Sequence, residues 1–173
     1  MRSAAEEEIS EFVRARYARL SRLAYLLCGD HGKAEDLVQT TLTKVALVWH
    51  RLDENVDHYT HRVLTNTYIS ARRRRSWFER PVAHTREWAG RDEFASVDDR
   101  DLLRRALARL PSRQRAAVVL RHYEDLSEEQ TAAVLGCAVG TVKSLTSRGL
   151  RSLRADLDAG RLPTAAGRGR DGS

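Results

Sequence analysis

The chain has 173 residues, which allow one or two small domains and are too few for a large enzyme scaffold. Hydrophobic residues make up 42% of it and charged residues 31%, which excludes wholesale disorder. Lys and Arg total 30 against 24 Asp and Glu, for a net charge of +6, and nearly all basic residues are arginine. Because arginine suits phosphates and base edges, a nucleic acid is the leading class of partner.

Residues 6–76 are predicted to form a first helical domain. Apolar residues recur at three- and four-residue steps from Phe12 to Leu27, and Gly29 ends the pattern. Asp30 can cap a second helix. The buried stripe of that helix is expected to comprise Leu37, Val38, Leu42, Val45 and Ala46.

A third helix is expected from about residue 57 to residue 75, with Tyr59, Val63 and Ile69 facing inward. Residues 77–98 include Pro81 and Gly90 and show no sustained period, so they are predicted to be a flexible linker. No segment alternates strictly between apolar and polar residues, and no sheet is expected.

Residues 99–157 are predicted to form a second helical domain. Leu102, Leu103, Ala106, Leu107 and Leu110 give its first helix an apolar face. Pro111 is expected at the first position of the next helix, which ends near Tyr123. The Gly-, Ala- and Arg-rich residues 158–173 are expected to be a disordered tail.

The segment 126–153 has the pattern of a helix-turn-helix. Ser127 is a natural N-cap, Ala132 is small enough for a close helix crossing, and Gly136 fits a left-handed helix end. The second helix is expected to turn Val142 and Leu150 toward the core. Its outer face carries Thr141, Lys143, Ser144, Ser147, Arg148 and Arg151. An amphipathic hairpin facing only water is the competing interpretation, but the absence of acidic residues on this face favours the major groove of DNA.

Residues 106–144, with the motif GTVKS, resemble region 4 of bacterial sigma factors. The similarity is greatest to the extracytoplasmic-function (ECF, group IV) class and, within it, to the actinobacterial SigE-like family. Residues 12–49 and 58–77 resemble region 2 of the same class. The resemblance covers both domains in the family's order. It implies an all-α protein of two small helical bundles that directs RNA polymerase to promoters.

For region 4, the resemblance implies recognition of the −35 element. The Lys, Ser and final Arg of the family motif fall on Lys143, Ser144 and Arg148. Arg151 is expected to hold a phosphate. Leu145 stands where the family often has Arg or Gln, and it either touches a thymine methyl group or packs on a neighbouring helix.

For region 2, the resemblance implies recognition and melting of the −10 element. Asn66 matches a family Asn whose amide can bond an unpaired base, whereas Ser70 replaces a frequent Asp. The unbroken run Arg72, Arg73, Arg74 and Arg75 favours phosphate binding over a merely solvated helix end. The loop 50–57 occupies the place of the family's pocket for an extruded base. Its residues Leu52, Glu54 and Asn55 are expected to set base preference.

The resemblance also implies protein partners. Asp36 and Gln39 lie on a helix resembling the segment that docks on the β′ clamp helices of core RNA polymerase, and region 4 is expected to contact the β flap. The DNA partners are double-stranded promoter and the single-stranded −10 non-template strand. Many members of the family are held by an anti-sigma factor, which is a further candidate partner.

No enzymatic activity or cofactor is expected. The chain has no phosphate-binding glycine motif or nucleophile elbow, and no acidic residue or cysteine completes a metal site with His58 and His61. With two cysteines, an acidic start and no apolar run of about 20 residues, the expected location is the cytoplasm, without a membrane partner.

Two other functions stay open at this level. One is a helix-turn-helix regulator that acts without core polymerase, which would bind palindromic duplex DNA by itself. The other is an adaptor or decoy that binds polymerase without reading DNA.

Overall fold

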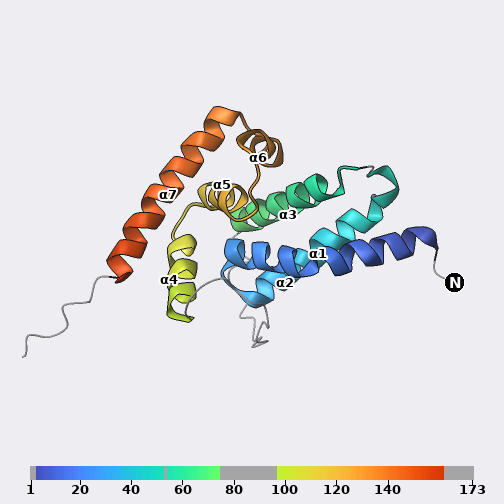
Figure 1. Ribbon diagram of the computed structural model, residues 1–173, viewed down its shortest axis with the longest axis horizontal. Coiled ribbons are helices and arrows are strands. Elements are labelled where there is room, and N and C mark those ends of the chain that lie inside the picture. The colour runs from blue at the N-terminus through green and yellow to red at the C-terminus, as the bar shows by residue number, and fades with distance from the viewer. Residues whose placement is uncertain (1–2, 53, 75–96, 162–173) are drawn as a thin grey trace, which may run out of the picture.

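The computed structural model describes residues 3–52, 54–74 and 97–161, which contain helices and turns and no β-strand (Figure 1). This confirms the predicted all-α fold class. The helices are α1 (Ala4–Cys28), α2 (His31–Leu47), a 3₁₀ turn η1 (Trp49–Arg51), α3 (Val56–Arg73), α4 (Val97–Ala108), α5 (Ser112–His122), α6 (Glu128–Leu135) and α7 (Val139–Arg161). No helix in these ranges combines the length and apolar character needed to cross a membrane.

Local side-chain chemistry sets the ends of the first helices. The Ser3 hydroxyl accepts a hydrogen bond from the Glu6 amide at 3.3 Å, and the Glu6 carboxylate accepts one from the Ser3 amide at 3.1 Å. Gly29 ends α1 in the left-handed conformation, with φ of 68°. Asp30 then caps α2 by accepting from the Lys33 amide at 2.9 Å. The predicted roles of Gly29 and Asp30 are confirmed.

The inward face of α3 differs from the predicted one. Tyr59 and Val63 are only half-buried. The residues that α3 buries are Thr60, Leu64, Thr65, Tyr68 and Ile69. Burial of Thr60 is tolerated because its hydroxyl donates to the Val56 carbonyl at 2.7 Å. Ile69 is buried as predicted. For Tyr59 and Val63 the prediction was wrong, because it counted only apolar residues and so placed that part of the core face about one position off.

The second set of helices extends beyond the predicted limits of 99 and 157. Helix α4 starts at Val97, and α7 continues to Arg161 because α4 packs along it and Gly160 lies closely against the Leu102 side chain. Pro111 is the N-cap of α5 and not its first helical residue. The predicted linker 77–98, except its last two residues, and tail residues 162–173 lie outside the described residues.

Helices α5 and α7 cross closely at Gly149. A Cβ atom there would lie 2.6 Å from the Val118 side chain and 3.3 Å from the Gln114 carbonyl oxygen. Val118 is itself buried and cannot simply move aside. Gly149 therefore fixes how near the long helix α7 approaches the rest of its bundle.

The first bundle (α1–α3) and the second bundle (α4–α7) are in contact. Helix α5 packs against α1 and α3, and α6 packs against α3 (Figure 1). One cluster of buried side chains runs from Leu27 and Tyr68 in the first bundle to Leu110 and Leu120 in the second. The sequence predicted two tethered bundles; it did not predict this shared core.

A buried arginine connects the bundles. Arg115 of α5 is only 1% exposed, and it donates to the Leu27 carbonyl at 2.5 Å and to the Ala108 carbonyl at 2.7 Å. It also donates to the Leu110 carbonyl at 3.2 Å. The first two carbonyls lie at the C-terminal ends of α1 and α4, where intrahelical donors run out. Arg115 thus caps one helix of each bundle.

We predict that Gly149→Ala lowers the free energy of unfolding by about 1–3 kcal/mol, because the added methyl group overpacks the α5–α7 crossing. Thermal unfolding followed by circular dichroism would measure this as a lower Tm. Gly140→Ala is the matched control, since nothing lies within 4 Å of a Cβ there and alanine favours helix. Its Tm should equal or exceed that of the parent. An unchanged Tm for Gly149→Ala would contradict the close crossing.

Candidate nucleic-acid interface

Helices α6 and α7 form a helix-turn-helix with the predicted caps. The Ser127 hydroxyl accepts from the Gln130 amide at 3.0 Å, and the Gln130 side-chain oxygen accepts from the Ser127 amide at 2.8 Å. Gly136 ends α6 with φ of 63°, and the Cys137 amide donates back to the Ala132 carbonyl at 3.1 Å. These bonds fix the turn that aims α7 away from α6.

The inner side of α7 anchors it to the core. Val142 is fully buried, as predicted, and Leu150 is half-buried. Leu145 is also half-buried and packs against the shared core cluster. Of the two roles left open for Leu145, packing on neighbouring helices is therefore the one the structure favours.

The outer side of α7 is fully accessible. Every residue that the sequence assigned to this face is exposed: Thr141, Lys143, Ser144, Ser147, Arg148 and Arg151. Lys143 Nζ lies 3.6 Å from Glu128 Oε2 at the start of α6, so an acidic side chain borders one edge of the face. The face combines hydroxyl groups with cations, which suits bases and phosphates together.

A second exposed polar row runs along α3. Asn66, predicted to contact an unpaired base, is exposed, and Arg62, Ser70 and Arg73 share its side of the helix at steps of three or four residues. Sequence reasoning missed Arg62, although its helical spacing from Asn66 could have indicated it.

The arginines at the end of α3 differ in their exposure. Arg73 and Arg74 are exposed, Arg72 is half-buried, and Arg75 lies outside the described residues. The exposed pair follows directly on the Asn66 row. A phosphate backbone lying along α3 would therefore meet Arg73 and Arg74 at one end.

The loop before α3 is held by aromatic and polar contacts. The rings of Phe12 and Trp49 meet edge to face, with centroids 5.3 Å apart, and Trp49 Nε1 donates to the Glu8 carboxylate at 3.3 Å. The predicted base-reading residues follow this anchor: Leu52 is half-buried, and Glu54 and Asn55 are exposed.

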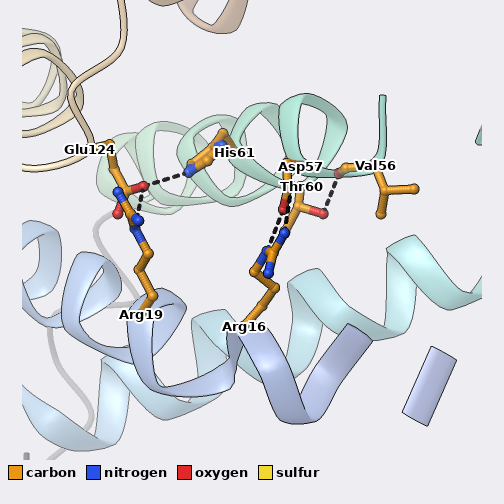
Figure 2. Close-up of polar contacts among 7 residues, drawn as sticks. All are labelled: Arg16, Arg19, Val56, Asp57, Thr60, His61 and Glu124. Atoms are coloured by element: carbon orange, nitrogen blue, oxygen red, sulfur yellow. Dashed lines mark hydrogen bonds and ion pairs between the residues drawn. The ribbon is translucent and has the colours of Figure 1, made fainter. Parts of the chain in front are cut away.

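A bidentate ion pair joins the first turn of α3 to α1. Arg16 Nε and a terminal nitrogen donate to the two Asp57 carboxylate oxygens at 2.7 and 2.9 Å (Figure 2). The hydrogen bonds from Arg16 hold the pKa of Asp57 below its usual value and raise that of Arg16. The pair fixes where the loop joins α3.

The predicted polymerase-binding residues Asp36 and Gln39 are exposed one turn apart on α2. Leu47 is also exposed on α2, at 72%, which is unusual for a leucine. Sequence reasoning did not single it out, because it sits next to a continuous apolar stripe. A polar pair and an accessible leucine on one helix suit a protein partner.

No group of three or more His, Cys, Asp or Glu side chains within residues 3–52, 54–74 and 97–161 could hold a metal ion. His61, considered with His58 in the sequence, instead contacts Glu124 at 2.9 Å.

The chain matches two family models: "Sigma-70 region 2" over residues 12–78 and "Sigma-70, region 4" over residues 100–153. It is 39% identical over 161 residues to the "RNA polymerase sigma-E factor" of Streptomyces coelicolor, covering 92% of this chain and 91% of that one. It is 33% identical over 141 residues to the "ECF RNA polymerase sigma factor SigM" of Mycobacterium tuberculosis, covering 80% and 71%. The chain belongs to the ECF sigma-factor family. The resemblance seen in the sequence is thereby confirmed.

The fold agrees with this assignment. The sigma factor RpoE of Bartonella quintana, solved in complex with the anti-sigma factor NepR, superimposes with a TM-score of 0.71 and 29% identity, covering 88% of this chain and 98% of that one. As an ECF sigma factor the chain is an alternative sigma factor that directs transcription. The alternative of a regulator acting without polymerase is not favoured, because both sigma regions are present in order.

We predict that Asp57→Asn lowers the free energy of unfolding by about 0.5–1 kcal/mol near pH 7; the loss is small because both partners are about half exposed. The pKa of Asp57 is lower in the folded chain than in the unfolded chain. The ion pair therefore stabilises the fold fully at pH values above the unfolded-state pKa, and less as the pH falls through the folded-state pKa. The difference in the free energy of unfolding between the parent and Asp57→Asn should be the same at about pH 5.5 and at about pH 7, and it should be smaller at about pH 3.5. Urea unfolding at each pH measures it, and a pH-independent difference would contradict the ion pair.

Proposed function

We propose that this ECF sigma factor binds core RNA polymerase in the cytoplasm and brings it to promoters with −35 and −10 elements, without catalysing a reaction itself. The observation that carries the proposal is the outer face of α7, where all six residues assigned to DNA are exposed while, on the inner side, Val142 is buried and Leu145 packs against the core cluster. Region 4 denotes the second bundle from here on, and region 2 the first.

Region 4 reads the −35 element through the outer face of α7. Arg148 donates to guanine acceptors, Lys143 to a base or a phosphate, and Arg151 to a phosphate. Thr141, Ser144 and Ser147 allow the helix to approach the groove closely. Lys143 must leave Glu128 to do so, which costs little because the two charges are 3.6 Å apart and the Lys143 side chain is 64% exposed.

Region 2 reads and melts the −10 element along α3. The Asn66 amide bonds an unpaired base, Arg73 and Arg74 hold the backbone, and Arg62 extends the cationic row. The exposed Glu54 and Asn55, with Leu52 behind them, line the path of an extruded base. Arg72, which is half-buried, and Arg75, which lies outside the described residues, remain expected phosphate contacts.

Polymerase docks on α2. Asp36 and Gln39 face the β′ clamp helices, and Leu47 adds an apolar contact to the same face. The second bundle contacts the β flap. An anti-sigma factor, which the sigma factor of Bartonella quintana binds, is a further partner proposed by similarity.

In vitro transcription with core polymerase on a randomised promoter library tests the function. The chain should select templates with two unlike elements at a fixed spacing. A purified chain that binds palindromic duplex DNA strongly without polymerase, or that starts no more transcripts than core polymerase alone, would contradict the proposal.

We predict that Arg148→Ala weakens use of the selected promoter by about 1–3 kcal/mol, roughly five- to 150-fold, and relaxes preference within the −35 element. Transcription on matched and mismatched −35 templates measures both effects. Arg105→Ala is the control, because it removes the same charge from an exposed position on α4 of the same bundle. It should leave promoter use unchanged. Equal loss in both variants would refute a base contact by Arg148.

We predict that replacing Arg73 and Arg74 together by Ala weakens promoter complexes uniformly across sequences. The slope of log affinity against log salt concentration should fall by about one to two units, since fewer counterions are released. Affinity titrations of the polymerase–chain complex at several salt concentrations measure the slope. Arg14→Ala, which removes one charge from an exposed position on α1, is the control and should leave the slope unchanged. A double variant with the same slope as the parent would argue against phosphate contacts by Arg73 and Arg74.

A further inference from the structure

The segment between η1 and α3 is held at both ends by α1. In η1, the Trp49 ring meets the Phe12 ring edge to face, with centroids 5.3 Å apart, and Trp49 Nε1 donates to Glu8 Oε2 at 3.3 Å. In the first turn of α3, Asp57 accepts two hydrogen bonds from Arg16, at 2.7 and 2.9 Å (Figure 2). The residues between these anchors that are proposed to read a base are called the reading loop: Leu52, Glu54 and Asn55.

The anchoring residues of α1 form one continuous row. Glu8, Phe12 and Arg16 follow one another at four-residue steps, so they lie on the same side of the helix. The guanidinium carbon of Arg16 lies 5.8 Å from the centroid of the Phe12 ring, a cation–π contact that links the two anchors. We call these three residues the α1 row. One helix therefore sets the distance between the two ends of the reading loop.

The start of α3 depends on the α1 row more than on its own cap. Asn55 is the N-cap of α3, but its side chain makes no capping hydrogen bond to the described residues of the first turn. A cavity of about 390 Å³ lies between α1 and α3 at this point, and Phe12, Arg16 and Asp57 are part of its lining. Because side chains do not fill this space, the ion pair rather than close packing sets the separation of the two helices here. The exposed Asn55 side chain keeps its amide for a base edge.

A loop that is held before binding selects bases more strictly than a loose one. Ordering a loose loop costs conformational entropy at the moment of binding, whereas a held loop has already lost that freedom. A held pocket also leaves a wrong base with clashes or unpaired polar groups, whereas a loose pocket can adapt to that base. Loss of an anchor is therefore expected to reduce discrimination between bases more than it reduces use of the preferred base.

We propose that the α1 row positions the reading loop and thereby sets how strictly region 2 selects the extruded −10 base. The proposal rests on the function proposed above. Glu8, Phe12 and Arg16 are positioning residues, which act through Trp49 and Asp57 and not by touching the base. The selectivity of the reading loop then depends on a helix that is distant from it in sequence as well as on its own side chains.

Hydrogen exchange of the free, full-length chain, followed by nuclear magnetic resonance, tests the positioning without polymerase. The Leu52 amide donates to the Trp49 carbonyl, and the Tyr59 amide donates to the Asn55 carbonyl, both at 3.0 Å. These two amides therefore report on local opening at the two ends of the reading loop.

Each end should respond to the loss of its own anchor. In Arg16→Ala, the Tyr59 amide should exchange about two- to fivefold faster, the range that a partly exposed ion pair supplies. In Phe12→Leu, the Leu52 amide should exchange about two- to tenfold faster, the range of an aromatic pair. Circular dichroism checks that both variants keep their helices. Exchange at the parent's rate in both folded variants would overturn the positioning.

Transcription by core polymerase with the full-length chain tests base selection. Four templates carry the selected promoter and differ only at the extruded base of the −10 element. Base preference is the ratio of transcription from the preferred template to transcription from the other three. This preference should fall about two- to fivefold in Arg16→Ala and about two- to tenfold in Phe12→Leu. Transcription from the preferred template should change less than the preference does.

Conservative variants and controls separate positioning from general stability. Phe12→Tyr keeps the ring and should keep the parent's preference. Arg16→Lys keeps the charge but loses the paired donors of a guanidinium group, so its preference should lie between those of the parent and Arg16→Ala. Arg14→Ala removes the same charge from an exposed position on α1, and Gly149→Ala overpacks the second bundle. Both of these controls should keep the parent's preference.

The two measurements distinguish this proposal from the proposed function. Faster exchange with unchanged preference would overturn the role in base selection and leave the proposed function standing. Faster exchange in a chain that starts no more transcripts than core polymerase alone would overturn the proposed function and retain the α1 row as the support of the loop. An equal loss of preference in Gly149→Ala and Arg16→Ala would assign the loss to stability and overturn the role in base selection.

Discussion

The arrangement of the whole chain depends on the guanidinium group of Arg115. Helix α1 has no basic residue in its last turn, and its Leu27 carbonyl receives a cationic partner from α5, 88 residues away. The same group closes the end of α4. Burial lowers the pKa of Arg115, which reflects the cost of removing the charge from water. Three carbonyl bonds offset that cost. The bonds to Ala108 and Leu110 lie within the second bundle, and the bond to Leu27 is made only while the two bundles are together.

Features that depend on a few neighbouring residues could be predicted from the sequence. Gly29 and Gly136 take the left-handed conformation, and Asp30 and Ser127 bond amides three residues ahead, because these interactions close within one helical turn. The outer face of α7 was predictable for a similar reason, since helical spacing alone separates Arg148 from Val142. The contacts of those exposed residues with promoter DNA are proposed from similarity to the family.

Features that depend on distant contacts could not be predicted. Arg115 and Glu124 are charged residues in a polar stretch, which sequence patterns assign to the surface, yet both are buried by partners on α1 and α3. Part of the core face of α3 was missed for a local reason: the Thr60 hydroxyl is satisfied within the helix, so Thr60 is buried like an apolar residue, and a count of apolar residues alone does not include it. The burial of Arg115 and Glu124, in contrast, leaves no record in local patterns.

Polar contacts add specificity to the apolar contact between the bundles. Apolar side chains of similar size in place of Arg115 and Glu124 would often bind as tightly or more tightly, because they need no desolvation of charge. They would also accept many relative orientations. The Glu124 carboxylate needs Arg19 on one side and His61 on the other, so it allows one relative orientation of the bundles. Once that orientation is lost, water solvates the carboxylate at little net cost. The contact between the bundles therefore combines an apolar cluster, which supplies the buried area, with charged groups, which fix the relative orientation of the bundles.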